Sequence, residues 1–197
     1  MDAIEYFKKN KYAHIPQMIS PDLASFIYNY LVIKGYTNLE FEPNGSSDNQ
    51  YMKCCYGDLS SETLLGMLLE TIEKVTQKNL CPTYSYTRLY TRGEILKPHT
   101  DRPSCQFSIT MNFGGDPWPI FFGEKNKDLL EDGYSLLNEI TMKPGDGVVY
   151  MGEDLVHWRN KFEGDHCAQS FLHYIDVDGP HYPEHKYDGR KNIGYTK

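Results

Sequence analysis

The sequence predicts an α+β protein in which helices precede an antiparallel β core of the sandwich or jelly-roll type. Two observations favour this class. Apolar residues recur at helical spacing in the first 80 residues, and short aromatic or β-branched runs, broken by Gly and Pro, follow from residue 81. Helices followed by about seven short strands are typical of such a chain. We expect one domain over 1–197, with a helical lead-in over 1–80, a jelly-roll core over 81–177 and a tail over 178–197.

Two helices are expected in the lead-in. The first begins at Ser20-Pro21-Asp22, where an N-cap serine precedes a proline at the first helical position, and it ends at Gly35. Ser60 or Ser61 caps the second, which ends at Asn79. Their apolar faces consist of Leu23, Phe26, Ile27, Tyr30 and Leu31 in the first helix and of Leu64, Leu65, Leu68, Leu69, Ile72 and Val75 in the second.

Seven short segments of the second part are predicted strands. They are rich in aromatic and β-branched residues, and Gly or Pro separates most of them. The segments are Tyr84–Tyr90, Gln106–Phe113, Pro119–Phe122, Glu139–Met142, Gly147–Tyr150, Leu155–Arg159 and Cys167–Ile175. The polar stretch 42–49 is a predicted loop, and the basic residues near the end of the chain are expected in a solvated tail.

Composition excludes several function classes. The net charge is −7, whereas proteins that bind phosphate backbones normally present a basic face, so nucleic acid is not an expected partner. The aromatic content of 14% fits β packing better than a platform for stacked bases. The five cysteines are odd in number and include no C-x-x-C pair, which argues against a disulfide framework or a zinc knuckle.

The first residues lack the basic and apolar regions of a signal peptide, and no apolar run approaches the roughly 20 residues that span a bilayer. We therefore expect a soluble, cytoplasmic protein without a membrane partner.

Three residues are the strongest candidates for a metal site. In His99-Thr100-Asp101 an imidazole and a carboxylate are two residues apart, so both point the same way in an extended segment. His157 follows in a predicted strand, shortly after the turn Pro144-Gly145-Asp146-Gly147. Two histidines and one carboxylate form the facial triad that suits Fe(II) and leaves positions open. We interpret the other C-terminal histidines as hydrogen-bonded residues rather than ligands: His166, His173, His181 and His185.

From Tyr86 to Tyr174 the chain resembles the 2-oxoglutarate/Fe(II)-dependent dioxygenase superfamily, in particular its prolyl-4-hydroxylase-like branch. The residues that carry the resemblance are Tyr86, Tyr90, Gly93, His99-Thr100-Asp101, the turn Pro144-Gly145-Asp146-Gly147 and His157. The segment from Tyr6-Phe7 to Ile15-Pro16 and the helix at Ser20-Pro21-Asp22 are similar to its lead-in. The resemblance implies a double-stranded β-helix core with N-terminal helices packed against it.

The same resemblance implies chemistry and cofactors. Members decarboxylate 2-oxoglutarate to succinate and CO₂ and oxidise a substrate C–H bond, using Fe(II), 2-oxoglutarate and O₂, with ascorbate as a candidate addition. Halogenating relatives carry a small residue where this chain has Asp101, so the resemblance favours hydroxylation. The next residue, Arg102, either contacts substrate or braces Asp101.

The chain departs from the family pattern at the co-substrate. Members hold the C5 carboxylate with Arg or Lys shortly beyond the distal His, but 165–170 contains neither. Arg159 is the first candidate anchor, because it shares a strand face with His157, about 6–7 Å along, and its guanidinium fork suits a carboxylate. Arg88 is the second, and a surface ion pair is the alternative for either. Further candidates for this pocket are Gln169 and His173 as neutral donors and Tyr86 and Tyr90, for which core packing is equally expected.

The leading interpretation is therefore an enzyme, a 2-oxoglutarate-dependent hydroxylase acting on a prolyl residue, another protein side chain or a small molecule. The segment 37–57 and the tail after Val177 are candidate substrate-binding regions. The alternatives are a non-oxygenase, cupin-like metal-binding jelly roll and an inactive binding module. The chain has no His-x-His, which counts against a cupin, and its intact triad counts against an inactive module. The sequence leaves the substrate and the oligomeric state open.

Overall fold

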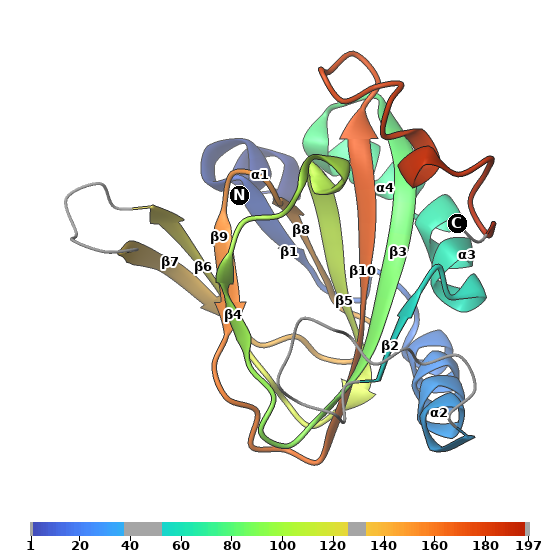
Figure 1. Cartoon of the computed structure of the whole chain (residues 1–197). Helices are drawn as coiled ribbons and strands as arrows, with labels where there is room; N and C mark the ends of the chain where they lie inside the picture. Colours follow the sequence, from blue (N-terminus) through green and yellow to red (C-terminus); the bar gives the residue numbers. More distant parts are fainter. Residues whose placement is uncertain (1, 38–52, 126–132, 196–197) are drawn as a thin grey trace.

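The computed structural model describes residues 2–37, 53–125 and 133–195. Two antiparallel sheets form the body (Figure 1), with strand orders β1-β8-β5-β10-β3-β2 in the larger sheet and β4-β9-β6-β7 in the smaller. The strands are β1 Tyr12–Ile15, β2 Lys53–Tyr56, β3 Leu80–Thr91, β4 Leu96–His99, β5 Phe107–Gly115, β6 Ile120–Lys125, β7 Tyr134–Ile140, β8 Gly147–Met151, β9 Val156–Arg159 and β10 His166–Asp176. The helices are α1 Ala3–Asn10, α2 Pro21–Thr37, α3 Leu59–Met67 and α4 Leu69–Thr76, with 3₁₀ turns η1 Pro103–Cys105 and η2 Lys186–Gly189.

Helices α2, α3 and α4 pack on the face of the larger sheet that points away from the smaller one (Figure 1). Strand alternation makes this two-sided packing work. On β3, Leu89 belongs to the hydrophobic core beneath the helices, whereas its neighbour Tyr90 faces the interior between the sheets. The larger sheet is therefore covered on one side by helices and lines a cavity on the other.

The first predicted helix is α2, which begins at Pro21 as predicted, and the Ser20 hydroxyl accepts a hydrogen bond from the Leu23 amide. It runs to Thr37 rather than ending at Gly35. The second apolar run is broken at Leu68 into α3 and α4.

Asp58, rather than a serine, caps α3, because its carboxylate accepts the Ser60 amide. Ser61 is buried and its hydroxyl instead bonds Thr87. Aspartate and serine are equally good N-cap residues, so the sequence alone could not decide between them. The contact of Ser61 with Thr87 in the folded protein leaves Asp58 as the cap.

The lead-in is not only helical. Strand β1 pairs with β8 and β2 pairs with β3, so both extend the larger sheet. The segment before His99 also forms a strand, β4, that was not expected, and β7 begins five residues before the predicted Glu139–Met142 segment (Tyr134 rather than Glu139) and ends two residues before it does. The predicted loop 42–49 lies outside the described residues, as does most of the candidate substrate segment 37–57.

The expectation of a solvated C-terminal tail is wrong. Asp188 and Arg190 are buried, and Arg190 donates to Glu62 of α3 at 3.1 Å and to the Thr83 carbonyl of β3 at 2.8 Å. Charged residues are thus used to attach the tail rather than to solvate it, which composition alone did not reveal.

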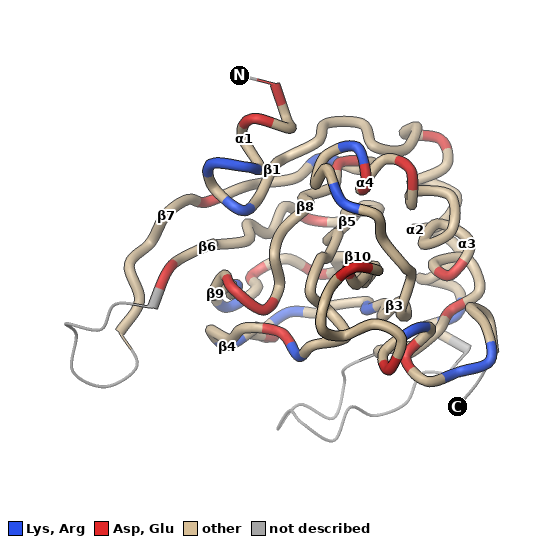
Figure 2. Tube along the Cα trace, turned by 90° about the horizontal axis from the view of Figure 1, so that it is seen from above, with Lys and Arg blue, Asp and Glu red and all other residues tan. Residues whose placement is uncertain are grey.

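Figure 2 shows blue Lys and Arg segments and red Asp and Glu segments interspersed around the trace of the described residues. Among those residues, no helix combines the length and the apolar character needed to cross a membrane.

Candidate metal centre and cavity

The three residues of the predicted triad lie together. His99, at the end of β4, is the cross-strand partner of His157 on β9, and their ring centroids are 4.3 Å apart. Asp101 follows β4, and its Oδ1 lies 3.5 Å from His99 Nε2 and 3.6 Å from His157 Nε2. One donor atom from each residue falls within 4.8 Å of the other two. Residues distant in the chain thus present three metal-binding atoms to one point.

Backbone contacts orient both imidazoles. His99 Nδ1 lies 2.8 Å from the Lys97 carbonyl, and His157 Nδ1 lies 3.0 Å from the Leu155 carbonyl. A ring nitrogen next to a carbonyl carries the proton and donates it, so the Nε2 of each ring keeps a free lone pair. Both lone pairs are therefore available toward Asp101, which is the arrangement of metal-ligating histidines.

Asp101 carries the charge of the site. Burial alone would raise the pKa of Asp101, but the imidazoles of His157 and His99 beside its carboxylate hold the pKa below its ordinary value. Its backbone amide donates to the Gly152 carbonyl at 2.8 Å, which fixes the carboxylate in place. Its Oδ2 is buried without a hydrogen-bond partner among the described residues. An ionised, buried oxygen with no donor is costly unless a cation completes it, so the donor set fits a metal ion.

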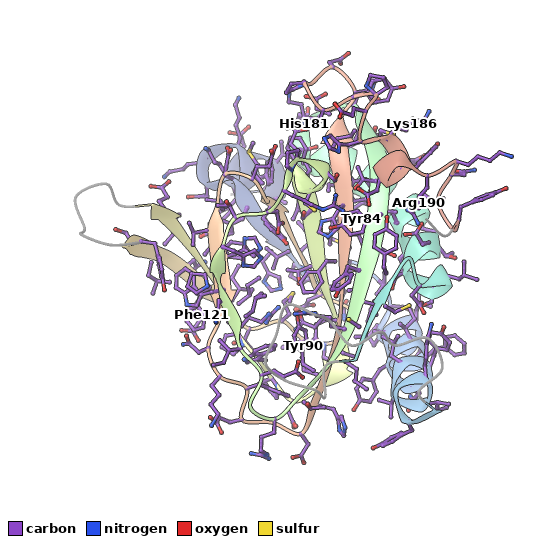
Figure 3. All side chains as sticks on the ribbon, viewed as in Figure 1. Tyr84, Tyr90, Phe121, His181, Lys186 and Arg190 are labelled. Atoms are coloured by element: carbon purple, nitrogen blue, oxygen red, sulfur yellow. The ribbon has the colours of Figure 1, made fainter. Side chains whose placement is uncertain are left out.

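A cavity of about 200 Å³ opens beside the three residues. Four of its lining residues alternate along β3 and therefore share one strand face. Figure 3 labels two of them, Tyr84 and Tyr90, which project from β3 toward the smaller sheet. The full lining comprises Tyr84, Tyr86, Arg88, Tyr90, Leu96, His99, Asp101, Tyr150, His157, Phe171 and His173.

Arg88 is the cation of the cavity wall. It is 8% exposed, its Nη1 donates to the Tyr90 hydroxyl at 3.3 Å, and its guanidinium lies over the rings of Tyr86 and Tyr90. Its Nε is buried with no hydrogen-bond partner among the described residues, and no ion pair with a described acidic residue satisfies its charge. The wall therefore holds a desolvated positive charge with unused donor capacity.

Arg159 shares the inward strand face with His157, as predicted, but lies outside the cavity lining. Its side chain is fully buried, and it donates to the Trp118 carbonyl and, at 2.5 Å, to Gln169 Oε1. Burial lowers the pKa of Arg159. Gln169 also accepts from the Thr110 hydroxyl at 3.3 Å and is likewise absent from the lining. Arg159 and Gln169 thus contact one another behind the wall, where Arg159 Nε, like Arg88 Nε, has no hydrogen-bond partner among the described residues.

Sequence reasoning missed Tyr84, Leu96 and Tyr150 in the lining. Tyr84 could have been found by extending the two-residue period from Tyr86, whereas Tyr150 had no distinguishing signal within its strand. His173, predicted to be a hydrogen-bonded residue, donates to or accepts from the Ser108 hydroxyl at 2.8 Å, and burial lowers its pKa to about 4. It also lines the cavity, so both interpretations of His173 hold.

No family model matches the sequence, and no curated protein matches it. Solved structures do. The non-heme alpha ketoglutarate dependent epimerase SnoN from nogalamycin biosynthesis superposes with a TM-score of 0.72, at 12% identity, over 89% of this chain and 82% of that chain. HygX from Streptomyces hygroscopicus, solved with nickel and 2-oxoglutarate, gives 0.67 at 13% identity over 89% and 87%.

A Pseudomonas putida prolyl-4-hydroxylase gives a TM-score of 0.64 at 11% identity, over 88% of this chain and 97% of that chain. Likeness at this identity reports the fold, and it extends over nearly the whole of both chains. The chain therefore has the fold of the 2-oxoglutarate/Fe(II) oxygenases, the superfamily that the sequence resembles.

Proposed function

We propose that the chain is a non-haem Fe(II)- and 2-oxoglutarate-dependent oxygenase that hydroxylates a C–H bond of a small molecule or of a peptide. The observation that carries the proposal is the convergence of His99, Asp101 and His157 on one point beside a cavity lined by Arg88, which has no acidic partner among the described residues. Strands β3 to β10 pass repeatedly between the two sheets, which supports assigning them to a double-stranded β-helix within a single domain.

His99, Asp101 and His157 would hold the metal. When bound, Fe(II) supplies the redox chemistry that couples oxidative decarboxylation of 2-oxoglutarate to attack on a C–H bond. The chain would contribute two imidazoles and one carboxylate, a donor set that leaves other positions of the ion for co-substrate and O₂. His99 is the most exposed of the three, with 39% of its side chain accessible against 2% for His157. Substrate would therefore approach past His99.

Arg88 is the candidate anchor for the C5 carboxylate of 2-oxoglutarate. Arg88 has no acidic partner among the described residues, and burying an unpaired cation costs free energy. A bound carboxylate would offset that cost, because its two oxygens match the guanidinium fork. Tyr86 and Tyr90 hold the guanidinium between their rings, and Tyr90 fixes one of its nitrogens. This choice replaces Arg159, the first candidate from the sequence, because Arg159 lies outside the cavity lining and donates to Trp118 and Gln169 behind it.

The remaining lining residues exclude water and shape the pocket. Aromatic rings from Tyr84, Tyr150 and Phe171 line the cavity together with Leu96. A dry pocket strengthens each charged contact inside it and protects reactive species from solvent. Solved neighbours with this fold have been crystallised with small-molecule ligands, nogalamycin RO for SnoN and hygromycin B for HygX. A small-molecule substrate class therefore stands beside the peptide one.

The test is succinate release from 2-oxoglutarate in the presence of Fe(II) and O₂, screened over amino acids, Pro-containing peptides and small molecules. We expect one substrate class to stimulate release and to gain one oxygen atom by mass spectrometry. His157→Ala should abolish release. His166→Ala, a histidine outside the cavity lining, is the matched control and should retain it.

Unchanged turnover in His157→Ala would refute the metal assignment. Succinate release without oxygen transfer to the product would support a 2-oxoglutarate-dependent enzyme but not a hydroxylase. The reaction would then be of another type, such as the epimerisation that SnoN catalyses.

A further inference from the structure

The C-terminal strap, residues 181–190, is attached to the rest of the protein by polar contacts. Figure 3 shows its course from His181, beyond the end of β10, past Lys186 to Arg190 beside α3. Asp188 is 7% exposed and Arg190 is 8% exposed, so both charges are buried on folding. Burying two charges is costly and is offset only where their partners are well placed. The strap therefore has a defined position, and its partners indicate what it does.

The first set of contacts reaches the residues directly after Asp101. Arg102 forms a bidentate pair with Asp188, with Nη1 at 2.9 Å from Oδ1 and Nη2 at 3.1 Å from Oδ2. The Ser104 hydroxyl donates to Asp188 Oδ1 at 3.0 Å, and the Tyr56 hydroxyl donates to Oδ2 at 2.6 Å. Asp188 thus accepts four hydrogen bonds, two of which fix the neighbour of a candidate metal ligand.

The second contact reaches the turn that precedes β9 and its His157. His181 Nε2 lies 2.9 Å from Glu153 Oε2. The same turn is joined to the other ligand segment directly, because the Asp101 amide donates to the Gly152 carbonyl. The strap therefore bridges the segment that carries Asp101 and the segment that leads to His157.

The backbone at the centre of the strap supports a positioning role. Tyr187 has a φ of 51° and Asp188 a φ of 55°, so two consecutive non-glycine residues are left-handed. A left-handed conformation is unfavourable for a non-glycine residue and persists where surrounding contacts over-determine it. The four hydrogen bonds of Asp188 are those contacts.

Arg102 also connects the strap to the cavity wall. Its guanidinium lies 4.6 Å from the centroid of the Tyr84 ring, and that ring lies 4.6 Å from the ring of His173. Tyr84 and His173 both line the cavity. Arg102 is therefore held between Asp188 on one side and the wall of the cavity on the other, which favours a bracing role over contact with substrate.

We propose that Asp188 is a positioning residue of the metal centre, acting through Arg102 to hold Asp101 and Tyr84 in their working places. The inference rests on the proposed metal role of Asp101, and it assigns the C-terminal strap a function that the triad does not contain. Substitution of Asp188 should lower the affinity of the site for a metal ion without removing any ligand, because residues that position metal ligands generally tune that affinity.

The experiment titrates the metal-free protein with Co²⁺, a probe stable in air, and follows the absorption bands of the bound ion. We expect Asp188→Asn to raise the Kd for Co²⁺ by about 10- to 100-fold and to shift the bands. Arg102→Lys, which keeps the charge but loses the fork, should do the same. The double variant Arg102→Lys/Asp188→Asn should bind no more weakly than the weaker single variant, because both residues act through one contact.

Lys78→Gln is the matched control. The Lys78–Asp176 pair has side-chain exposures of 50% and 8%, close to the 47% and 3% of Arg102–Asp188, but it touches neither ligand segment. Its Kd for Co²⁺ should stay within about two-fold of the wild type, because the pair contacts neither ligand segment and distant sites act independently. Circular dichroism at the titration temperature establishes that each variant is folded, and Arg102→Lys, at a half-exposed residue, carries the test if Asp188→Asn does not fold.

Two results overturn the inference, and they are distinguishable. Wild-type affinity and spectra in both folded variants would show that the strap does not act on the metal site, while the proposed function would stand. Failure of the wild-type protein to bind Co²⁺ would refute the proposed function and the inference together.

Discussion

The two walls of the cavity differ in how firmly the sequence identifies their function. The wall from the smaller sheet presents His99 and His157 as a direct cross-strand pair, with Asp101 next to them. The wall from the larger sheet presents Arg88 among tyrosines. The first wall can be recognised from residue types and spacing. The second depends on which of the two candidate arginines, Arg88 or Arg159, lines the cavity, and only the tertiary structure decides that.

The largest expected effect tests the metal wall. Asp101→Ala removes the only carboxylate of the triad and leaves two imidazoles. We expect the Kd for Co²⁺ to rise by more than about 100-fold, because even partners of ligands are worth 10- to 100-fold. Titration of the metal-free protein measures it, and the neighbouring Thr100→Ala serves as the control. Retained affinity in Asp101→Ala would mean that the three residues do not form the metal site.

The contrast between the two arginines shows how far sequence reasoning could go. Residue alternation correctly placed Arg159 on the face of His157 and Arg88 on the face of Tyr86 and Tyr90. It could not reveal that Arg159 donates hydrogen bonds to Trp118 and Gln169 outside the cavity lining, because those partners come from separate parts of the chain. Strand positions could be predicted because they depend on neighbouring residues, whereas hydrogen-bond partners depend on residues that are distant in the chain.

The C-terminal strap gives the same lesson at larger scale. Short-range composition made His185 to Lys191 look solvated, because alternating charges usually face water. Asp188 and Arg190 are buried only because Arg102 and Glu62 meet them there, at sequence distances that no local pattern covers. The long β3 and β10 strands, in contrast, carry their own aromatic and β-branched signal and were predicted within a few residues.

The second-largest effect separates the arginines by stability. Arg159→Met removes the donor of the buried Trp118 carbonyl and leaves Gln169 Oε1 with only the Thr110 hydroxyl. We expect the free energy of unfolding to fall by about 2–4 kcal/mol, since a buried group left unsatisfied costs about 1–3 kcal/mol and a lost hydrogen bond about 0.5–1.5 kcal/mol. Urea denaturation measures the loss. The KM for 2-oxoglutarate in the folded variant should be near that of the wild type.

The opposite outcome for Arg159→Met is informative. A large rise in KM with unchanged stability would make Arg159 the anchor and reverse the comparison between the two arginines.

The third effect tests the anion wall directly. Arg88→Gln removes the charge that we assign to the C5 carboxylate, while retaining a polar side chain. We expect a loss of about 1.5–3 kcal/mol in co-substrate binding, the usual worth of a hydrogen bond to a charged group, which is roughly 10- to 150-fold in KM. Steady-state kinetics with varied 2-oxoglutarate measures it. Arg92→Gln, at an exposed arginine that pairs with Asp165, is the control and should not change KM. An unchanged KM in Arg88→Gln would leave the anchor unassigned.

The smallest effect concerns the tyrosines that hold Arg88. Tyr90→Phe removes the hydroxyl that accepts from Arg88 Nη1 and keeps the ring, whereas Tyr86 contributes its ring face to the guanidinium. This hydrogen bond orients Arg88 and does not contact the co-substrate, so we expect a loss of only about 0.5–1.5 kcal/mol in co-substrate binding, a rise of roughly 2- to 12-fold in the KM for 2-oxoglutarate with little change in kcat. Tyr86→Phe should change KM less than Tyr90→Phe, because the ring face persists. Equal effects of the two substitutions would mean that the hydroxyl of Tyr90 does not orient Arg88, and the anion wall would then act through charge alone.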